Sequence, residues 1–213
     1  MFTPDLKHLR RVLCLGCHAD DIEIGCGGSM LRLLQEHPRL EVWWVVFSGD
    51  PERAAEARRS AESWLTGAGE QQIICGDFRD RYFPAQWEQV KEFVHGIGAR
   101  FEPDLIFTHR RDDAHQDHRI VGELTWNAFR NHLIWEYEIP KYEGDLGQPN
   151  VFCALDEAFC RRKIELLGDV FPSQRGKPWF SADAFWALLR LRGLECNSPS
   201  RFAEAFYARK SLV

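Results

Sequence analysis

The chain has 213 residues, a formal net charge of -5 and 45% hydrophobic residues. This size and composition fit one globular domain over residues 1–213, and the acidic balance argues against a nucleic-acid partner. The apolar runs are too short for a transmembrane segment or a signal peptide. Seven scattered cysteines are typical of reduced thiols, so we expect a cytoplasmic protein.

Segments with strand and helix patterns alternate between residues 11 and 140. Short apolar runs predict strands over residues 11–16, 40–48, 71–76, 104–109 and 134–139. Helical spacing of apolar residues predicts helices over residues 29–35, 51–65, 85–100 and 116–131. The glycine-rich run Gly25–Gly28 would lead into the first helix, with Ser29 at its start. This alternation predicts a Rossmann-like three-layer α/β sandwich with a mostly parallel sheet.

The remainder of the chain, residues 141–213, has a weaker pattern. We expect a strand over residues 151–155, helices over 157–167 and 182–191, and either type over 203–209. This segment is interpreted as a C-terminal lid or flank on the same domain.

Histidine and aspartate side chains follow two of the predicted strands. The groups are His18, Asp20 and Asp21 after the first strand, and His115, Asp117 and His118 after the fourth. In parallel sheets a ligand binds at the carboxyl ends of the strands, so we expect these residues to meet there. Two histidines and one carboxylate with an open fourth position hold catalytic zinc. His115 and His118 share one helix face, so one can bind metal while the other faces substrate.

Both groups resemble signatures of the PIG-L (LmbE-like) N-deacetylases. His18-Ala19-Asp20-Asp21, followed by Gly25–Gly28, resembles the family's His-Pro-Asp-Asp motif, and His115-Gln116-Asp117-His118 resembles its His-Pro-Asp-His motif. Residues 52–67 resemble its helix with an Arg-x-x-Glu pattern. The likeness covers at least residues 11–140, and Ser173-Gln174 and Ala203–Phe206 are similar to its glycan-related branch.

The resemblance implies a role for each motif residue. His18, Asp21 and His118 would bind zinc, with ferrous iron as the alternative metal. Asp20 would be the general base, and His115 would stabilise or protonate the tetrahedral intermediate. Asp117 would orient a histidine, and Arg53 would contact substrate hydroxyls. Either Asp20 or His115 would protonate the leaving amine.

Two positions depart from the family pattern. Ala19 replaces its proline, and Ile22 replaces the acid that follows the aspartate pair, with Glu23 one place later. No proposed ligand or base is lost, but the shape of the loop and the role of Glu23 stay open. Arg53 lies among many charged residues, so a solvated helix face is the alternative reading for it.

The resemblance implies a hydrolase that removes an N-acetyl or other N-acyl group from an N-acetylglucosamine-type sugar or glycoconjugate. It also implies a homo-oligomer, a trimer or a hexamer. Two alternatives stay open: a metal-dependent hydratase with the same site, and a non-catalytic metal- or ligand-binding protein. Four tryptophans are candidates for a sugar platform or for core packing, namely Trp126, Trp135, Trp179 and Trp186.

Overall fold

The computed structural model describes residues 5–211; the first four and the last two residues of the predicted domain lie outside it. The described strands are β1 Arg11–Gly16, β2 Glu41–Ser48, β3 Glu70–Phe78, β4 Leu105–His109, β5 Leu133–Tyr137, β6 Val151–Leu155 and β7 Phe202–Tyr207. The α-helices are α1 Asp21–Glu36, α2 Pro51–Trp64, α3 Trp87–Gly98, α4 Gln116–Ala128, α5 Glu157–Val170 and α6 Ala182–Glu195. Short 3-10 helices cover Phe83–Gln86 and Pro172–Gln174.

The strands form one sheet in the order β3-β2-β1-β4-β5-β7-β6. The first five are parallel to one another, whereas β7 runs antiparallel to β5 and to β6. The mostly parallel sheet is therefore as predicted, and the C-terminal flank adds its last two strands. No helix within residues 5–211 is long and apolar enough to cross a lipid bilayer.

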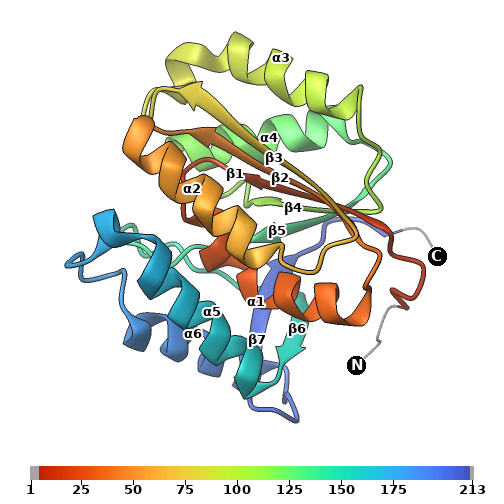
Figure 1. Ribbon diagram of the computed structural model, residues 1–213, viewed down its shortest axis with the longest axis vertical. Coiled ribbons are helices and arrows are strands. Elements are labelled where there is room, and N and C mark those ends of the chain that lie inside the picture. Colours follow the sequence, from red (N-terminus) through yellow and green to blue (C-terminus); the bar gives the residue numbers. More distant parts are fainter. Residues whose placement is uncertain (1–4, 212–213) are drawn as a thin grey trace.

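Helices cover both faces of the sheet, as Figure 1 shows. On β1, Val12 and Cys14 belong to the core shared with α1, α2 and α5. The alternate residues Leu13 and Leu15 belong to the core shared with α3 and α4. Side chains of successive strand residues point to opposite faces, so a strand without polar interruption is buried on both sides. This confirms the predicted three-layer architecture.

Helix α1 begins earlier than predicted, at Asp21 instead of Ser29, and contains the whole glycine-rich run. Glycine is a weak helix former, which is why the run resembled a loop. Tertiary packing overrides this preference, because a Cβ at Gly25 would overlap the ring of Tyr137. A Cβ at Gly27 would lie 2.9 Å from Nε1 of Trp64. The glycines therefore allow α1 to lie close to its neighbours.

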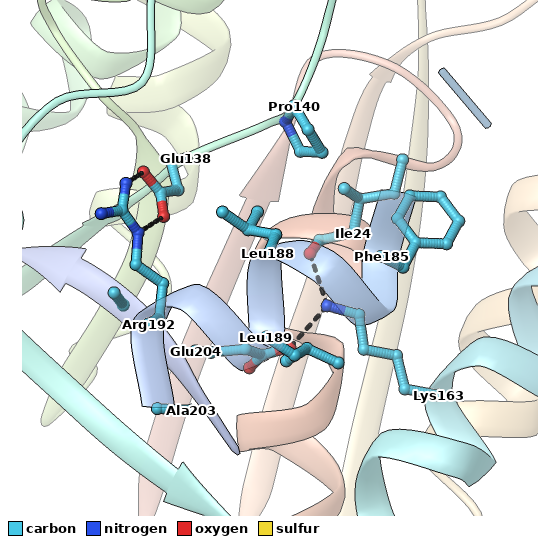
Figure 2. A pocket seen from close by; sticks show the side chains of 12 residues that line it. Ile24, Glu138, Pro140, Lys163, Phe185, Leu188, Leu189, Arg192, Ala203 and Glu204 are labelled. Carbon is cyan, nitrogen blue, oxygen red and sulfur yellow. Dashed lines mark hydrogen bonds and ion pairs between the residues drawn. The ribbon is translucent and has the colours of Figure 1, made fainter. Parts of the chain in front are cut away.

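A buried ion pair joins the C-terminal flank to α1 (Figure 2). Nζ of Lys163 on α5 lies 2.7 Å from Oε1 of Glu204 on β7 and donates to the carbonyl of Ile24 at 2.6 Å. The Glu204 carboxylate also accepts the backbone N–H groups of Gly28 and Ser29, at 2.8 and 2.7 Å. Removing one partner would leave an uncompensated buried charge, which costs about 3–5 kcal/mol.

A second buried ion pair connects α6 with the segment that follows β5, also visible in Figure 2. The guanidinium of Arg192 donates to both carboxylate oxygens of Glu138, at 2.6 and 2.7 Å. Two parallel bonds of this kind fix orientation as well as distance. The flank is therefore attached to the sheet at two buried points, and the chain leading from Glu138 to Lys141 takes a defined path.

We expect Gly25→Ala to lower the free energy of unfolding by about 1–3 kcal/mol, because its methyl group would overlap the Tyr137 ring. Urea unfolding followed by circular dichroism measures this change. Gly96→Ala is the matched control: Gly96 lies in α3, and apart from the adjacent residues and nearby backbone of that helix no atom of residues 5–211 lies within 4 Å of its virtual Cβ. That variant should gain up to about 1 kcal/mol. Equal stability of the two variants would contradict the packing role of Gly25.

Candidate metal centre and active site

The two predicted motif groups meet in one pocket at the carboxyl edge of the parallel strands. The pocket encloses about 580 Å³, a volume suited to a small organic ligand. The motif residues that line it are His18, Asp20, Asp21, Arg53, His115 and His118. Asp117 is fully buried beneath them. The structure thus brings all the predicted site residues to one place.

The side chains predicted to bind metal point toward one another. Oδ2 of Asp21 lies 3.2 Å from Nδ1 of His18 and 3.5 Å from Nε2 of His118, and the two nitrogens are 3.2 Å apart. Zinc ligands at about 2.0–2.1 Å in tetrahedral geometry lie roughly 3.3 Å from one another. The spacing and the chemistry of this donor set fit one zinc or ferrous ion.

A pair of carboxylates orients His18 from behind. Its Nε2 lies 2.9 Å from Oδ1 of Asp80 and 3.4 Å from Oδ2 of Asp117. Asp117 is itself fixed, because it accepts the backbone N–H groups of Arg81 at 2.6 Å and Phe83 at 3.2 Å. Arg81 has φ 68°, a left-handed conformation that non-glycine residues rarely adopt. With Nε2 engaged in this way, Nδ1 of His18 is the nitrogen that faces the donor set.

A different carboxylate orients His118, and the sequence did not single it out. Nδ1 of His118 lies 3.1 Å from Oδ2 of Asp113, which also pairs with Nζ of Lys141 at 3.0 Å. Asp113 and Asp80 are the two functional residues that sequence reasoning missed. Both sit in motif-bearing or neighbouring loops, but nothing in the sequence distinguishes them from the other acidic residues there.

Burial and charge set the protonation of the donor set. Burial opposes ionisation of Asp21, but the neighbouring histidines, His118 first, outweigh it and hold its pKa well below the usual value. Burial, reinforced by the charge of His109, lowers the pKa of His118 to about 3. Burial also disfavours charge on His18, but Asp21 and the other carboxylates around it raise that pKa well above the usual value. Metal binding must therefore displace a proton from His18.

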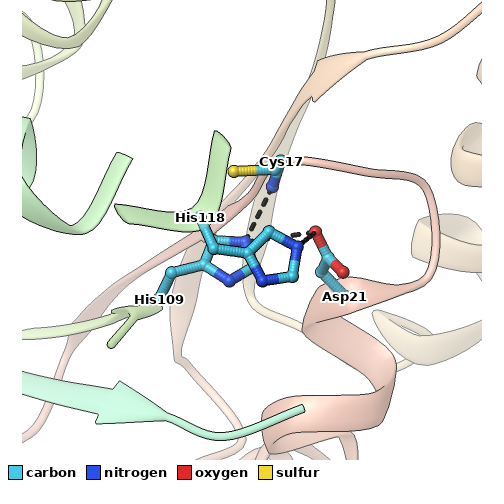
Figure 3. A group of neighbouring side chains, drawn as sticks. All are labelled: Cys17, Asp21, His109 and His118. Atoms are coloured by element: carbon cyan, nitrogen blue, oxygen red, sulfur yellow. Dashed lines mark hydrogen bonds and ion pairs between the residues drawn. The ribbon is translucent and has the colours of Figure 1, made fainter. Parts of the chain in front are cut away.

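Cys17 and His109 lie next to Asp21 and His118, as Figure 3 shows. The His109 ring stacks on His118 with 3.9 Å between centroids, and its Nε2 lies 3.1 Å from Oδ2 of Asp21. Cys17 is near enough to count as a ligand by distance. However, burial and the charge of Asp21 raise the pKa of its thiol well above the usual value. A protonated thiol is a poor ligand, and Nε2 of His109 already accepts the backbone N–H of Cys17 at 2.9 Å, so these two residues are better suited to support than to binding.

The carboxylate of Asp20 lies at the pocket wall with one oxygen uncommitted. Oδ1 accepts a hydrogen bond from Nη2 of Arg53 at 3.0 Å, whereas Oδ2 is buried and has no hydrogen-bond partner among residues 5–211. Burial raises the pKa of Asp20, and the charge of Arg53 acts in the opposite direction. Arg53 also donates to Glu56 at 2.9 Å and to Ser173 at 3.0 Å. Its side chain is only 19% exposed, so it does not belong to a solvated helix face.

His115 lies beside both histidines of the donor set. Its ring centroid is 5.1 Å from that of His18 and 4.5 Å from that of His118. Its Nδ1 is buried without a hydrogen-bond partner in the described part of the chain. Burial, together with the charge of His18, lowers its pKa. A neutral imidazole with uncommitted polar atoms can donate a hydrogen bond to a ligand oxygen.

Glu23, whose role the sequence left open, lies in the core and not in the pocket. It is fully buried and accepts a hydrogen bond from the Ser60 hydroxyl on α2. Burial raises the pKa of Glu23 to about 8, so its carboxyl group is largely protonated at neutral pH. Glu23 therefore links α1 to α2 as a neutral polar group.

Comparison with known proteins gives matches in sequence. The profile of the family described as "PIG-L: GlcNAc-PI de-N-acetylase" matches residues 13–129. The uncharacterised deacetylase YaiS of Escherichia coli (strain K12) is 26% identical over 163 residues, which cover 73% of this chain and 88% of YaiS.

Comparison with solved structures shows the same fold in two kinds of enzyme. N,N'-diacetylchitobiose deacetylase from Pyrococcus horikoshii has a TM-score of 0.69 at 19% identity, covering 96% of this chain and 85% of its own. The 4-carboxy-2-hydroxymuconate hydratase GalB from Pseudomonas putida KT2440 has a TM-score of 0.69 at 15% identity, covering 96% and 98%. At such identities the likeness concerns the fold alone. The family profile, however, covers more than half of the chain and both histidine–aspartate motifs, so the protein belongs to the PIG-L family.

Proposed function

We propose that the protein is a zinc-dependent N-deacetylase that hydrolyses the acetamide of an N-acetylglucosamine-type sugar or glycoconjugate. The observation that carries this proposal is the position of the uncommitted Asp20 oxygen beside a donor set of zinc-like spacing, in one pocket. The family supports hydrolytic N-deacetylation. The relative from Pyrococcus horikoshii is named for diacetylchitobiose, a sugar, which favours a sugar substrate here.

His18, Asp21 and His118 would hold the metal, which when bound would polarise the acyl carbonyl and make water more acidic. Asp20 takes the proton of the attacking water through its uncommitted oxygen. Arg53 keeps the other Asp20 oxygen in place, and its remaining N–H groups can reach substrate hydroxyls. His115 donates a hydrogen bond to the oxygen that becomes negative in the tetrahedral intermediate. Asp20 then returns its proton to the leaving amine.

Two other functions have to be distinguished from this one. A hydratase needs a base and a metal as well, and GalB shares the fold. A non-catalytic binding protein would need the donor set but not Asp20 or His115.

Ferrous iron is the alternative metal, because imidazole and carboxylate ligands suit both ions. The family resemblance further implies a trimer or a hexamer, which sedimentation velocity measures directly.

We expect metal-stripped protein to release no acetate from N-acetyl sugars, nucleotide sugars and glycosides, and added zinc to restore release from at least one of them. The reason is that the carbonyl is polarised and the water activated only when the donor set is loaded. Enzymatic detection of acetate measures the rate, and parallel addition of ferrous iron tests the metal. If fully zinc-loaded protein releases no acetate from the whole panel, the deacetylase proposal fails.

We expect Asp20→Asn to keep zinc and to lose activity by about 100- to 10,000-fold, because an amide cannot accept the water proton. Zinc content by atomic absorption and kcat on the best substrate are the two measurements. Asp77→Asn serves as control, since Asp77 is an exposed carboxylate on β3. Undiminished turnover in Asp20→Asn would disprove the assignment of the base.

We expect Asp113→Asn to weaken zinc binding by about 10- to 100-fold, because carboxylates that orient a ligand histidine contribute this much to affinity. Competition with a chelator of known affinity gives the dissociation constant. Asp112→Asn is the neighbouring control, since Asp112 pairs with Arg209 and not with a donor histidine. A zinc affinity equal to that of the wild type would show that Asp113 does not position His118.

A further inference from the structure

The wall of the pocket contains one cationic side chain that pairs with no carboxylate among residues 5–211. The cationic side chains lining it, besides the histidines, are Arg53, Arg81, Lys141 and Lys177. The first three each pair with a carboxylate: Arg53 with Asp20, Arg81 with Asp80, and Lys141 with Asp113. Lys177 forms no ion pair with any carboxylate of residues 5–211, and its hydrogen bond goes to a neutral amide oxygen. Its charge is therefore available to a ligand.

The ammonium group of Lys177 is exposed and makes one hydrogen bond, to a buried amide. Nζ donates to Oε1 of Gln174 at 2.5 Å, and Gln174 is only 4% exposed. The Gln174 amide is oriented in turn, because its Nε2 donates to the Ser173 hydroxyl at 2.9 Å. That hydroxyl donates to Glu56 at 2.6 Å. A lysine side chain loses rotamer entropy when it binds a ligand, and a hydrogen bond that already favours one rotamer reduces that loss.

Trp179 provides an apolar surface next to this charge. The indole ring lines the same pocket and lies 5.7 Å from Nζ of Lys177. Phe180 supports it edge-on at 5.6 Å between centroids. An aromatic ring with an adjacent polar group suits a ligand that has an apolar face and a polar end. Gln174 uses only one of the three N–H groups of the ammonium, which leaves two for an anion.

We propose that Lys177 and Trp179 form an outer subsite that binds an anionic group, a carboxylate or a phosphate, carried by the acylated substrate. The preferred substrate is then an acidic N-acylated glycoside instead of a neutral one. The pocket is also lined by carboxylates, namely Asp20, Asp21, Asp50, Asp80 and Glu143, so an anionic group would be attracted to its wall only beside a cation without a carboxylate partner, such as Lys177. This inference rests on the proposed deacetylase function.

The test compares three substrates that share one sugar: the methyl glycoside, the carboxymethyl glycoside and the 1-phosphate of N-acetylglucosamine. With zinc-loaded wild-type protein, kcat/KM should favour at least one anionic substrate over the methyl glycoside by about 10- to 100-fold, as expected for a charged hydrogen bond. The better anion identifies carboxylate or phosphate. Lys177→Met should bring this ratio of kcat/KM values close to one, mainly because KM for the anionic substrate rises. An unchanged ratio in Lys177→Met, or no preference in the wild type, overturns the proposal.

Two further variants separate charge from structure. Lys177→Arg keeps the positive charge and should retain most of the preference, whereas its loss would point to a structural role for Lys177. Lys91→Met is the matched control, because Lys91 lies 5.0 Å from the ring of Trp87 on α3, away from the residues that line the pocket. It should leave the ratio of anionic to neutral substrate as in the wild type. A collapse of that ratio in Lys91→Met would overturn the assignment to Lys177.

Binding measurements distinguish a failure of the anionic subsite from a failure of the proposed deacetylase activity. If no substrate releases acetate, the deacetylase proposal fails, and calorimetry with the same three compounds tests the subsite alone. Tighter binding of an anionic compound to wild-type protein than to Lys177→Met supports the subsite. Equal dissociation constants for the two proteins overturn it.

Discussion

The close approach of α1 to the sheet is the constraint on which the rest of the structure depends. Asp21 is the first residue of α1 and His18 lies in the turn before it, so this helix positions both side chains. Gly25 lets α1 lie against Tyr137, whose hydroxyl donates to the carbonyl of Leu15 on β1 at 2.6 Å. In the middle of the same helix, Gly28 and Ser29 donate their backbone N–H groups to the Glu204 carboxylate of the flank. Helix α1 therefore positions residues of the candidate site and also binds the C-terminal flank.

Most of the architecture could be predicted from sequence because strands buried on both faces are continuous apolar runs, and the helices between them have a clear period. The start of α1 could not be predicted. Glycine has a low helix propensity, so the run Gly25–Gly28 predicts a loop. The side chains that require glycine there, Tyr137 and Trp64, lie far away in sequence. The sequence predicted the helices and strands of the C-terminal flank. It did not predict that the flank extends the sheet, because this depends on pairing between β5, β6 and β7.

The motif residues could be named beforehand because strand ends in parallel sheets converge and because the two motifs resemble those of a known family. In the structure all of them except the buried Asp117 line one pocket. The carboxylates that orient the motif histidines could not be assigned to them from the sequence. Asp112, Asp113 and Asp117 are close in sequence, yet only the turn before α4 determines that Asp113 faces His118 and Asp117 faces His18. The environment of Lys177 likewise depends on the buried amide of Gln174. Such roles follow from backbone paths, which a residue pattern does not specify.

The place of β7 has a consequence for how the chain folds as it leaves the ribosome. β7 is the last strand in sequence, yet it lies between β5 and β6. The parallel strands β1 to β5 can pair before residues 202–207 are synthesised, and β5 then presents an unpaired edge. Pairing between distant segments is slow, and an open edge can recruit strands from other chains. Until β7 has been synthesised, β5 is therefore an additional open edge of the sheet, and both histidine–aspartate motifs already precede it in the chain.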